Sequence, residues 1–108
     1  MKNEISVAVQ FLVRVIERSN PNDVFPKEQI EAFKERLTEV LKDRFENHWF
    51  PDKPTRGQGY RCIRLNESDK RDKVIDKAAS YCGIVYEHLR LPTELTIWVD
   101  PTEVCCRY

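Results

Sequence analysis

Four cysteines and two histidines are the side chains of this sequence best suited to bind a metal or act as nucleophiles. The cysteines stand at positions 62, 82, 105 and 106, and the histidines are His48 and His88. Structural zinc sites use closely spaced ligand pairs such as Cys-x-x-Cys, and the sequence contains no such pair. We therefore expect free thiols in a reducing compartment, with no metal site and no disulfide framework.

Other reactive patterns are equally weak. The stretch RGQGYR (56–61) places two glycines between arginines, as phosphate-binding loops do. It lacks the full GxGxxG pattern and does not lead from a strand into a helix. No spacing brings a cysteine and a histidine together as a nucleophile pair, and the carboxylates are scattered. The sequence therefore predicts no enzyme and no cofactor.

The segment HWFPDKPTRGQGYRCI (48–63) combines three aromatic residues with two prolines, two glycines and several basic side chains. The prolines exclude a helix or a central strand, and Gly57 and Gly59 allow a sharp reversal of the chain. We expect a shaped loop that delivers a short strand from Tyr60. Such loops, carried on a rigid scaffold, commonly hold binding residues.

A second aromatic segment, LTIWVDP (95–101), alternates like a strand. Leu95, Ile97 and Val99 point to one face, so Trp98 points to the other together with Thr96 and Asp100. An outward tryptophan either packs beneath another element or anchors a partner, and the pattern leaves both options open for Trp98 and Tyr60. Trp49 directly follows a predicted helix, which favours packing. We interpret the two segments as one protein-binding surface.

Length and charge limit the class of protein. The chain has 108 residues, enough for one domain, and its 18 basic residues balance 18 acidic ones. A neutral chain has no broad electrostatic footprint for nucleic acid, although the basic cluster at 53–61 is a local exception. No apolar run is long enough to cross a bilayer, and the N-terminus lacks a signal-peptide pattern. We expect a soluble, intracellular protein.

Apolar residues at helical spacing predict three main helices. The first covers 4–18, with Asn3 as its N-cap and apolar positions 5, 8, 9, 12 and 16 on one face. The second begins at Pro26 and ends near Asn47. The third covers 70–82, with Ser68 or Asp69 as its cap and Gly83 at its C-terminal end.

The connecting segments complete the predicted topology. We expect loops at 19–26 and 66–69, a short helical turn within 84–89, and a type I turn at Asp100-Pro101 that folds a strand from Val104 back onto 95–99. The predicted fold class is therefore α+β. It is a single compact domain in which about three main helices, plus short ones, pack on a small antiparallel sheet with a C-terminal hairpin.

The two aromatic segments resemble the two signature boxes of the BTG/TOB antiproliferative family. HWFPDKPTRGQGYRCIR resembles the first box and LPTELTIWVDPTEVCCRY the second. The opening MKNEI and the ending EVCCRY look most like the ANA-like branch of that family. The likeness covers residues 1–108, and both boxes are long enough to be specific.

The resemblance implies a non-catalytic adaptor. Family members bind the Caf-type nuclease subunit of the CCR–NOT deadenylase complex, promote shortening of mRNA poly(A) tails and restrain the cell cycle, in the cytoplasm and the nucleus. The family's nuclease-binding surface comes from both boxes. Its tyrosine, tryptophan and acid correspond to Tyr60, Trp98 and Asp100, and the matching motifs place a rim at Lys53, Pro101 and Glu103.

The sequence also departs from the family pattern. Family domains continue past the second box with a Gly-Glu turn and another apolar strand, whereas this sequence stops at Tyr108. We therefore expect either a truncated domain or a sheet completed by another chain at the 104–108 edge. Lys73 stands where many relatives have a proline, which concerns helix capping more than function.

Two other functional classes stay open beside the adaptor. The family resemblance also permits a transcriptional cofactor that binds DNA-binding factors through the same surface. A small enzyme or a direct RNA binder is disfavoured by the zero net charge, and only the basic cluster at 53–61 supports it. We expect no membrane association.

Overall fold

Three helices and three strands form the framework of the protein in a computed structural model that describes residues 1–22 and 24–108. The elements in chain order are α1 (Lys2–Ser19), α2 (Lys27–Phe45), the 3-10 helix η1 (Gln58–Arg61), β1 (Cys62–Leu65), α3 (Lys73–Tyr81), the 3-10 helix η2 (Tyr86–Leu89), β2 (Leu95–Asp100) and β3 (Glu103–Arg107). The predicted α+β class is confirmed. Asp23, in the expected loop at 19–26, lies outside the described residues.

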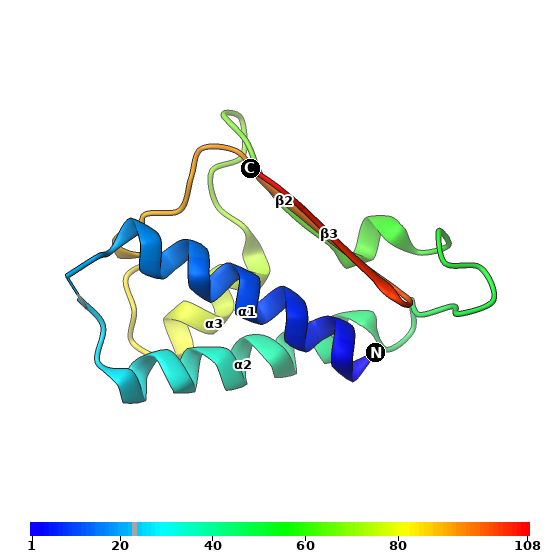
Figure 1. The fold of residues 1–108 in the computed structure, drawn as a ribbon, viewed down its shortest axis with the longest axis horizontal. Coiled ribbons are helices and arrows are strands. Elements are labelled where there is room, and N and C mark those ends of the chain that lie inside the picture. The colour runs from blue at the N-terminus through cyan, green and yellow to red at the C-terminus, as the bar shows by residue number, and fades with distance from the viewer. Residues whose placement is uncertain (23) are drawn as a thin grey trace.

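The strands form one antiparallel sheet in the order β1-β2-β3. Trp98 in the central strand lies opposite Cys62 of β1 and Cys105 of β3. The three α-helices lie on one side of this sheet, as Figure 1 shows with the sheet seen nearly edge-on. The other face of the sheet is therefore free of α-helices, and we call it the helix-free face.

The core lies between the sheet and the helices. Leu95, Ile97 and Val99 of β2 are at most 1% exposed, as the alternation in the sequence predicts. They meet the apolar stripes of α1 and α2, whose buried members include Ile5, Leu12, Ile16, Phe33, Leu37, Leu41 and Phe45. Burying side chains of this size contributes roughly 1.5–3 kcal/mol each, so this layer holds the sheet in place.

Several predicted boundaries were wrong in detail. Asn3 lies inside α1, whose N-cap is Met1, and Pro26 is the N-cap of α2 rather than its first residue. The cap of α3 is Asp72, whose Oδ1 accepts hydrogen bonds from the N–H groups of Val74 and Ile75 at 2.8 and 3.0 Å. The turn at 66–69 is instead closed by Asn66, so the serine and aspartate within it have no capping role.

The hairpin between β2 and β3 has an unusual second residue. Thr102 has a φ of 67°, whereas a type I turn requires a negative φ at that position. The predicted type I turn was therefore wrong. A β-branched residue in the left-handed region is strained, and the Thr102 N–H donates to Glu4 Oε2 at 2.9 Å, which ties the hairpin to the start of α1.

This tie should make stability depend on pH. The hydrogen bond from Thr102 is the main reason that the pKa of Glu4 lies below its usual value, and the N-terminal ammonium lies 3.2 Å from the same carboxylate. A lowered pKa means that the stabilisation is complete above about pH 4.3 and is lost as the pH falls through the folded-state pKa. In urea unfolding we expect Glu4→Gln to be less stable than the wild type at pH 7, with the difference shrinking at pH 3. A difference that does not shrink would contradict this account of Glu4.

No helix within the described residues is long and apolar enough to cross a membrane.

Candidate functional site

A single buried arginine organises the loop that joins α2 to β1. Arg61 is 0% exposed. It stands two residues before Ile63 and four before Leu65, and all three of these alternate side chains point into the protein. Its guanidinium donates to the carbonyl oxygens of Val99 at 2.8 Å, Arg56 at 2.7 Å and Pro54 at 2.6 Å, and also to that of His48. These bonds connect both sides of the loop to the end of β2.

The same guanidinium binds the acid of the second box. Arg61 Nη2 lies 3.1 Å from Asp100 Oδ1, and Gln58 Nε2 donates to Asp100 Oδ2 at 2.9 Å. The side chain of Asp100 is only 13% exposed. The carboxylate is therefore already paired within the chain, and its first role is to join the two sequence boxes.

Gly57 makes this close packing possible. Its φ of 76° lies in the left-handed region, and a Cβ there would stand 3.0 Å from the carbonyl oxygen of His48 and 3.2 Å from Arg61 Nη1. Gly57 therefore has the predicted backbone freedom, and it also allows a close approach that the sequence did not predict. Gly59 has neither a positive φ nor a neighbour within 4 Å of such a Cβ.

Tyr60 lies on the surface but is held in place. Its side chain is 55% exposed, and its ring stacks on that of His48 with centroids 3.8 Å apart and an interplanar angle of 8°. Arg44 Nε donates to its carbonyl oxygen at 2.8 Å. Tyr60 belongs to η1, and the strand begins at Cys62, so the prediction of a strand from Tyr60 was wrong.

Trp98 lies on the helix-free face of the sheet and is partly buried. Because Trp98 pairs with Cys62, and Tyr60 precedes Cys62 by two residues, both aromatic residues stand at the same end of the sheet. Trp49, in contrast, packs against the core, stacked on Phe45 with centroids 6.4 Å apart and with the Arg61 guanidinium 5.5 Å from its ring centre. The packing role expected for Trp49 is confirmed.

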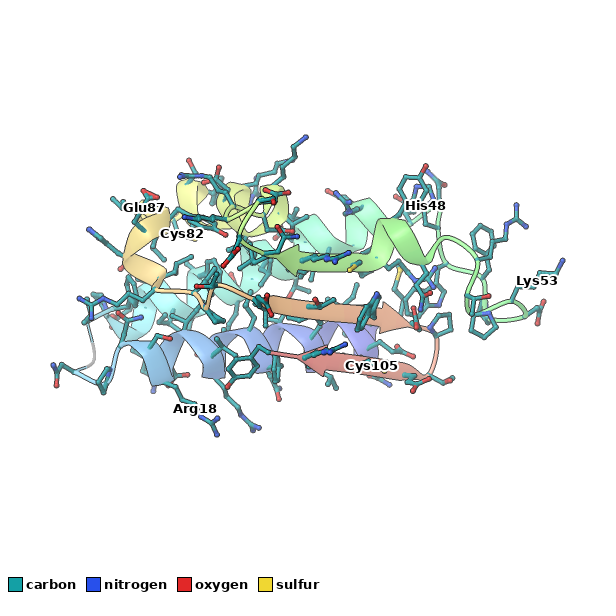
Figure 2. The ribbon with its side chains drawn as sticks, turned by 90° about the horizontal axis from the view of Figure 1, so that it is seen from above. Arg18, His48, Lys53, Cys82, Glu87 and Cys105 are labelled. Carbon is teal, nitrogen blue, oxygen red and sulfur yellow. The ribbon has the colours of Figure 1, made fainter. Side chains whose placement is uncertain are left out.

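The three expected rim residues differ in exposure. Lys53 is exposed at the tip of the loop, away from the strands (Figure 2). Glu103 is exposed opposite Asp100 at the hairpin end, where its Oε1 accepts a hydrogen bond from the Cys105 thiol at 3.4 Å. Pro101 is buried by other residues of this chain, so it offers little surface to a partner.

The cysteines show no arrangement for catalysis. All four are free, and the described residues contain no group of three His, Cys, Asp or Glu side chains that could hold a metal. Burial raises the pKa of Cys62, Cys82 and Cys106, and the hydrogen bond to Glu103 raises that of Cys105. Raised values disfavour the thiolate, which is the nucleophilic form.

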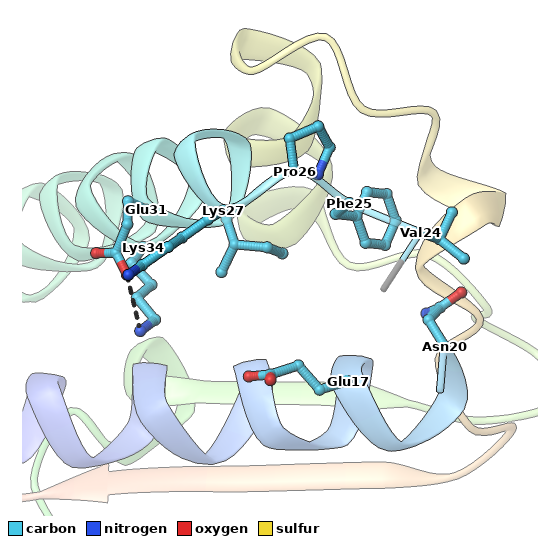
Figure 3. Close-up of a pocket in the computed structure, with 9 residues that line it drawn as sticks. Glu17, Asn20, Val24, Phe25, Pro26, Lys27, Glu31 and Lys34 are labelled. Atoms are coloured by element: carbon cyan, nitrogen blue, oxygen red, sulfur yellow. Dashed lines mark hydrogen bonds and ion pairs between the residues drawn. The ribbon is translucent and has the colours of Figure 1, made fainter. Parts of the chain in front are cut away.

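A hollow between two helices lies at the other end of the molecule from the two sequence boxes. It has a volume of about 530 Å³ between the end of α1 and the start of α2 (Figure 3). Val24, Phe25 and Ile30 give it an apolar lining, and charged groups such as Glu17 and the Glu31–Lys34 ion pair at 3.4 Å surround them. Neither sequence box contributes to it.

Comparison with known proteins identifies the family to which this chain belongs. The family model described as "BTG family" matches residues 1–108. The chain belongs to the BTG family. Relatives of this BTG domain include "Protein BTG3" from mouse and from human, each 48% identical over the whole of this chain, and human "Protein BTG4", which is 42% identical. The chain spans 42% of the length of the two BTG3 proteins and 47% of BTG4.

A solved structure with the same fold is the "C. elegans FOG-3 BTG/Tob domain - H47N, C117A". It superposes with a TM-score of 0.82, covers 99% of this chain and 74% of that one, and is 23% identical in sequence. At this identity the likeness concerns the fold alone. It supports the arrangement of three helices on a small antiparallel sheet in this BTG domain.

Proposed function

We propose that this BTG domain is a non-catalytic adaptor that binds the Caf-type nuclease subunit of the CCR–NOT deadenylase complex. By recruiting that subunit it promotes shortening of mRNA poly(A) tails and restrains cell proliferation. The proposal needs no cofactor, metal, nucleic acid or membrane, and it assigns the protein to the cytoplasm and the nucleus.

The observation that carries the proposal is the junction of the two boxes. The ion pair between Arg61 and Asp100 joins them, and beside it Tyr60 and Trp98 offer aromatic surface at one end of the sheet. Aromatic side chains are typical anchors of protein interfaces, because they bury a large area while losing little conformational freedom. The stacking of Tyr60 on His48 fixes one anchor in advance, which lowers the entropy cost of binding.

A second function uses the same surface. A transcriptional cofactor would present these aromatic residues to a DNA-binding factor, and the exposure of Tyr60 favours both roles equally. The adaptor and the cofactor functions are distinguished by which class of protein binds to this surface.

Capture from cell extract, compared between two versions of the chain, tests the proposal. The bait is the wild-type chain, and the control bait carries Tyr60→Ala and Trp98→Ala. We expect CCR–NOT subunits, the nuclease among them, to dominate the proteins captured by the wild type and to be lost with the control. The opposite result would be that the wild type captures DNA-binding factors, that the control bait loses them, and that neither bait captures a deadenylase subunit. That result would support the cofactor role and overturn the adaptor.

A further inference from the structure

Two arginines on the helix-free face of the sheet have no acidic partner among the residues that the structure describes. Arg64 of β1 and Arg107 of β3 flank Thr96 of β2 in the sheet register. Both are exposed, and none of the ion pairs among the described residues involves either of them. Arg36, Arg61 and Arg71, in contrast, each pair with a carboxylate.

The side chains of Arg64 and Arg107 can bind the same anionic group. Residues two strands apart are separated by about 10 Å, and each arginine side chain is long enough to bring its guanidinium above Thr96. Two such cations repel each other when no anion lies between them, so an anion bound there gains attraction from both and relieves that repulsion.

The arginines and Trp98 line one groove. Its volume is about 610 Å³, and its lining includes Arg64, Arg107, Thr96, Trp98 and, as its acidic member, Glu94. The groove is therefore continuous with the surface to which the proposed function assigns the nuclease subunit. Figure 2, which views the sheet from its helix-free side, shows β2 and β3 lying in front of the helices and Cys105, the cross-strand neighbour of Trp98, on β3.

Charge changes sign along this face. Arginines flank Thr96, Trp98 follows two residues later, and two residues after that the exposed Glu103 lies opposite Asp100, whose charge is already paired with Arg61. Successive positions on one face of a strand are about 6.6–6.8 Å apart. A partner with acidic groups on one side of its Trp98-binding pocket is attracted in only one orientation.

We propose that Arg64 and Arg107 recognise an acidic segment, rich in Asp or Glu, of the protein that docks on Trp98. This inference rests on the proposed function and identifies that protein as the nuclease subunit. The pair sets the orientation of the complex and its dependence on salt, while Trp98 supplies the desolvated anchor.

The test is a titration of the purified nuclease subunit with the purified chain at about 0.05 M and about 0.5 M salt. The test variant is Arg64→Glu with Arg107→Glu. The control is Lys42→Glu with Lys77→Glu, which makes the same change in net charge on exposed positions of α2 and α3, behind the sheet. Circular dichroism checks the fold of each, and Arg64→Gln with Arg107→Gln replaces the test variant if that one does not fold.

We expect the test variant to bind about tenfold or more weakly at low salt, with the loss falling to about threefold or less at high salt. The control should stay within about threefold of the wild type. Wild-type affinity in the test variant, or an equal loss in the control, overturns the inference and leaves the adaptor function standing. Failure of the wild type to bind at all overturns both.

Discussion

Replacing Arg61 with methionine should lower the free energy of unfolding by about 3 kcal/mol or more, as expected when one partner of a buried ion pair is removed. Methionine fills a similar volume but donates no hydrogen bonds. Asp100 would lose its cation, and the carbonyl groups of Val99, His48, Pro54 and Arg56 would lose a shared donor. Denaturant unfolding followed by circular dichroism measures the change.

Arg64→Met provides the matched control, because Arg64 lies three residues further along the chain but is exposed and takes part in none of the described ion pairs. Its effect should stay within about 0.5 kcal/mol. If Arg61→Met does not fold, Arg61→Lys keeps the charge but loses the planar fork of donors, and it should still be clearly destabilised. If Arg61→Met or Arg61→Lys lowered the free energy of unfolding by less than about 1 kcal/mol, the organising role of Arg61 would be contradicted.

Replacing Trp98 with alanine should weaken binding of the nuclease subunit by about 2 kcal/mol or more, roughly thirtyfold, because the indole is the central anchor of the proposed surface. The fold should survive, since Trp98 lies on the helix-free face and the core residues of β2 are Leu95, Ile97 and Val99. Calorimetric titration of the purified subunit measures the affinity, and thermal unfolding verifies the fold.

Tyr81→Ala is the control for this loss. Tyr81 is 69% exposed at the end of α3, outside both sequence boxes, so its removal should leave the affinity within about 0.5 kcal/mol of the wild type. A folded Trp98→Ala variant that binds the subunit as tightly as the wild type would refute the anchor.

The elements that bury a regular apolar pattern were predictable. The apolar stripes of α1 and α2 follow the helical period, and Leu95, Ile97 and Val99 alternate with the period of a strand. If either pattern faced the solvent, a large apolar area would be exposed. Gly83 was also predictable as the end of α3, because its φ of 71° is a conformation that glycine tolerates best.

The features that depend on contacts between distant segments were not predictable from local patterns. Nothing near Thr102 in the sequence indicates its positive φ or its bond to Glu4, which is 98 residues away. Capping by Asp72 instead of Ser68 or Asp69 follows from the short turn that Asn66 closes, which delays the start of α3. Boundaries of this kind are where pattern reasoning is least reliable.

Arg61 is the main residue of the site that sequence reasoning missed. It was grouped with Lys53 and Arg56 as part of a basic cluster, although its parity with Ile63 and Leu65 indicated the core side of the strand. A buried arginine is rare unless it is paired, so this parity and the acid at position 100 were the available signals. The partner-binding roles of Tyr60, Trp98, Asp100, Lys53, Pro101 and Glu103 stay predictions.

Hydrogen exchange of the chain, measured with and without the purified nuclease subunit, tests most directly whether the two boxes form one docking surface. We predict that binding slows exchange in two segments together, 56–62 and 96–104, while amides at the start of α2, beside the hollow at the opposite end, exchange as before. Slowing confined to one of the two segments, or centred on that opposite end, would contradict a shared surface.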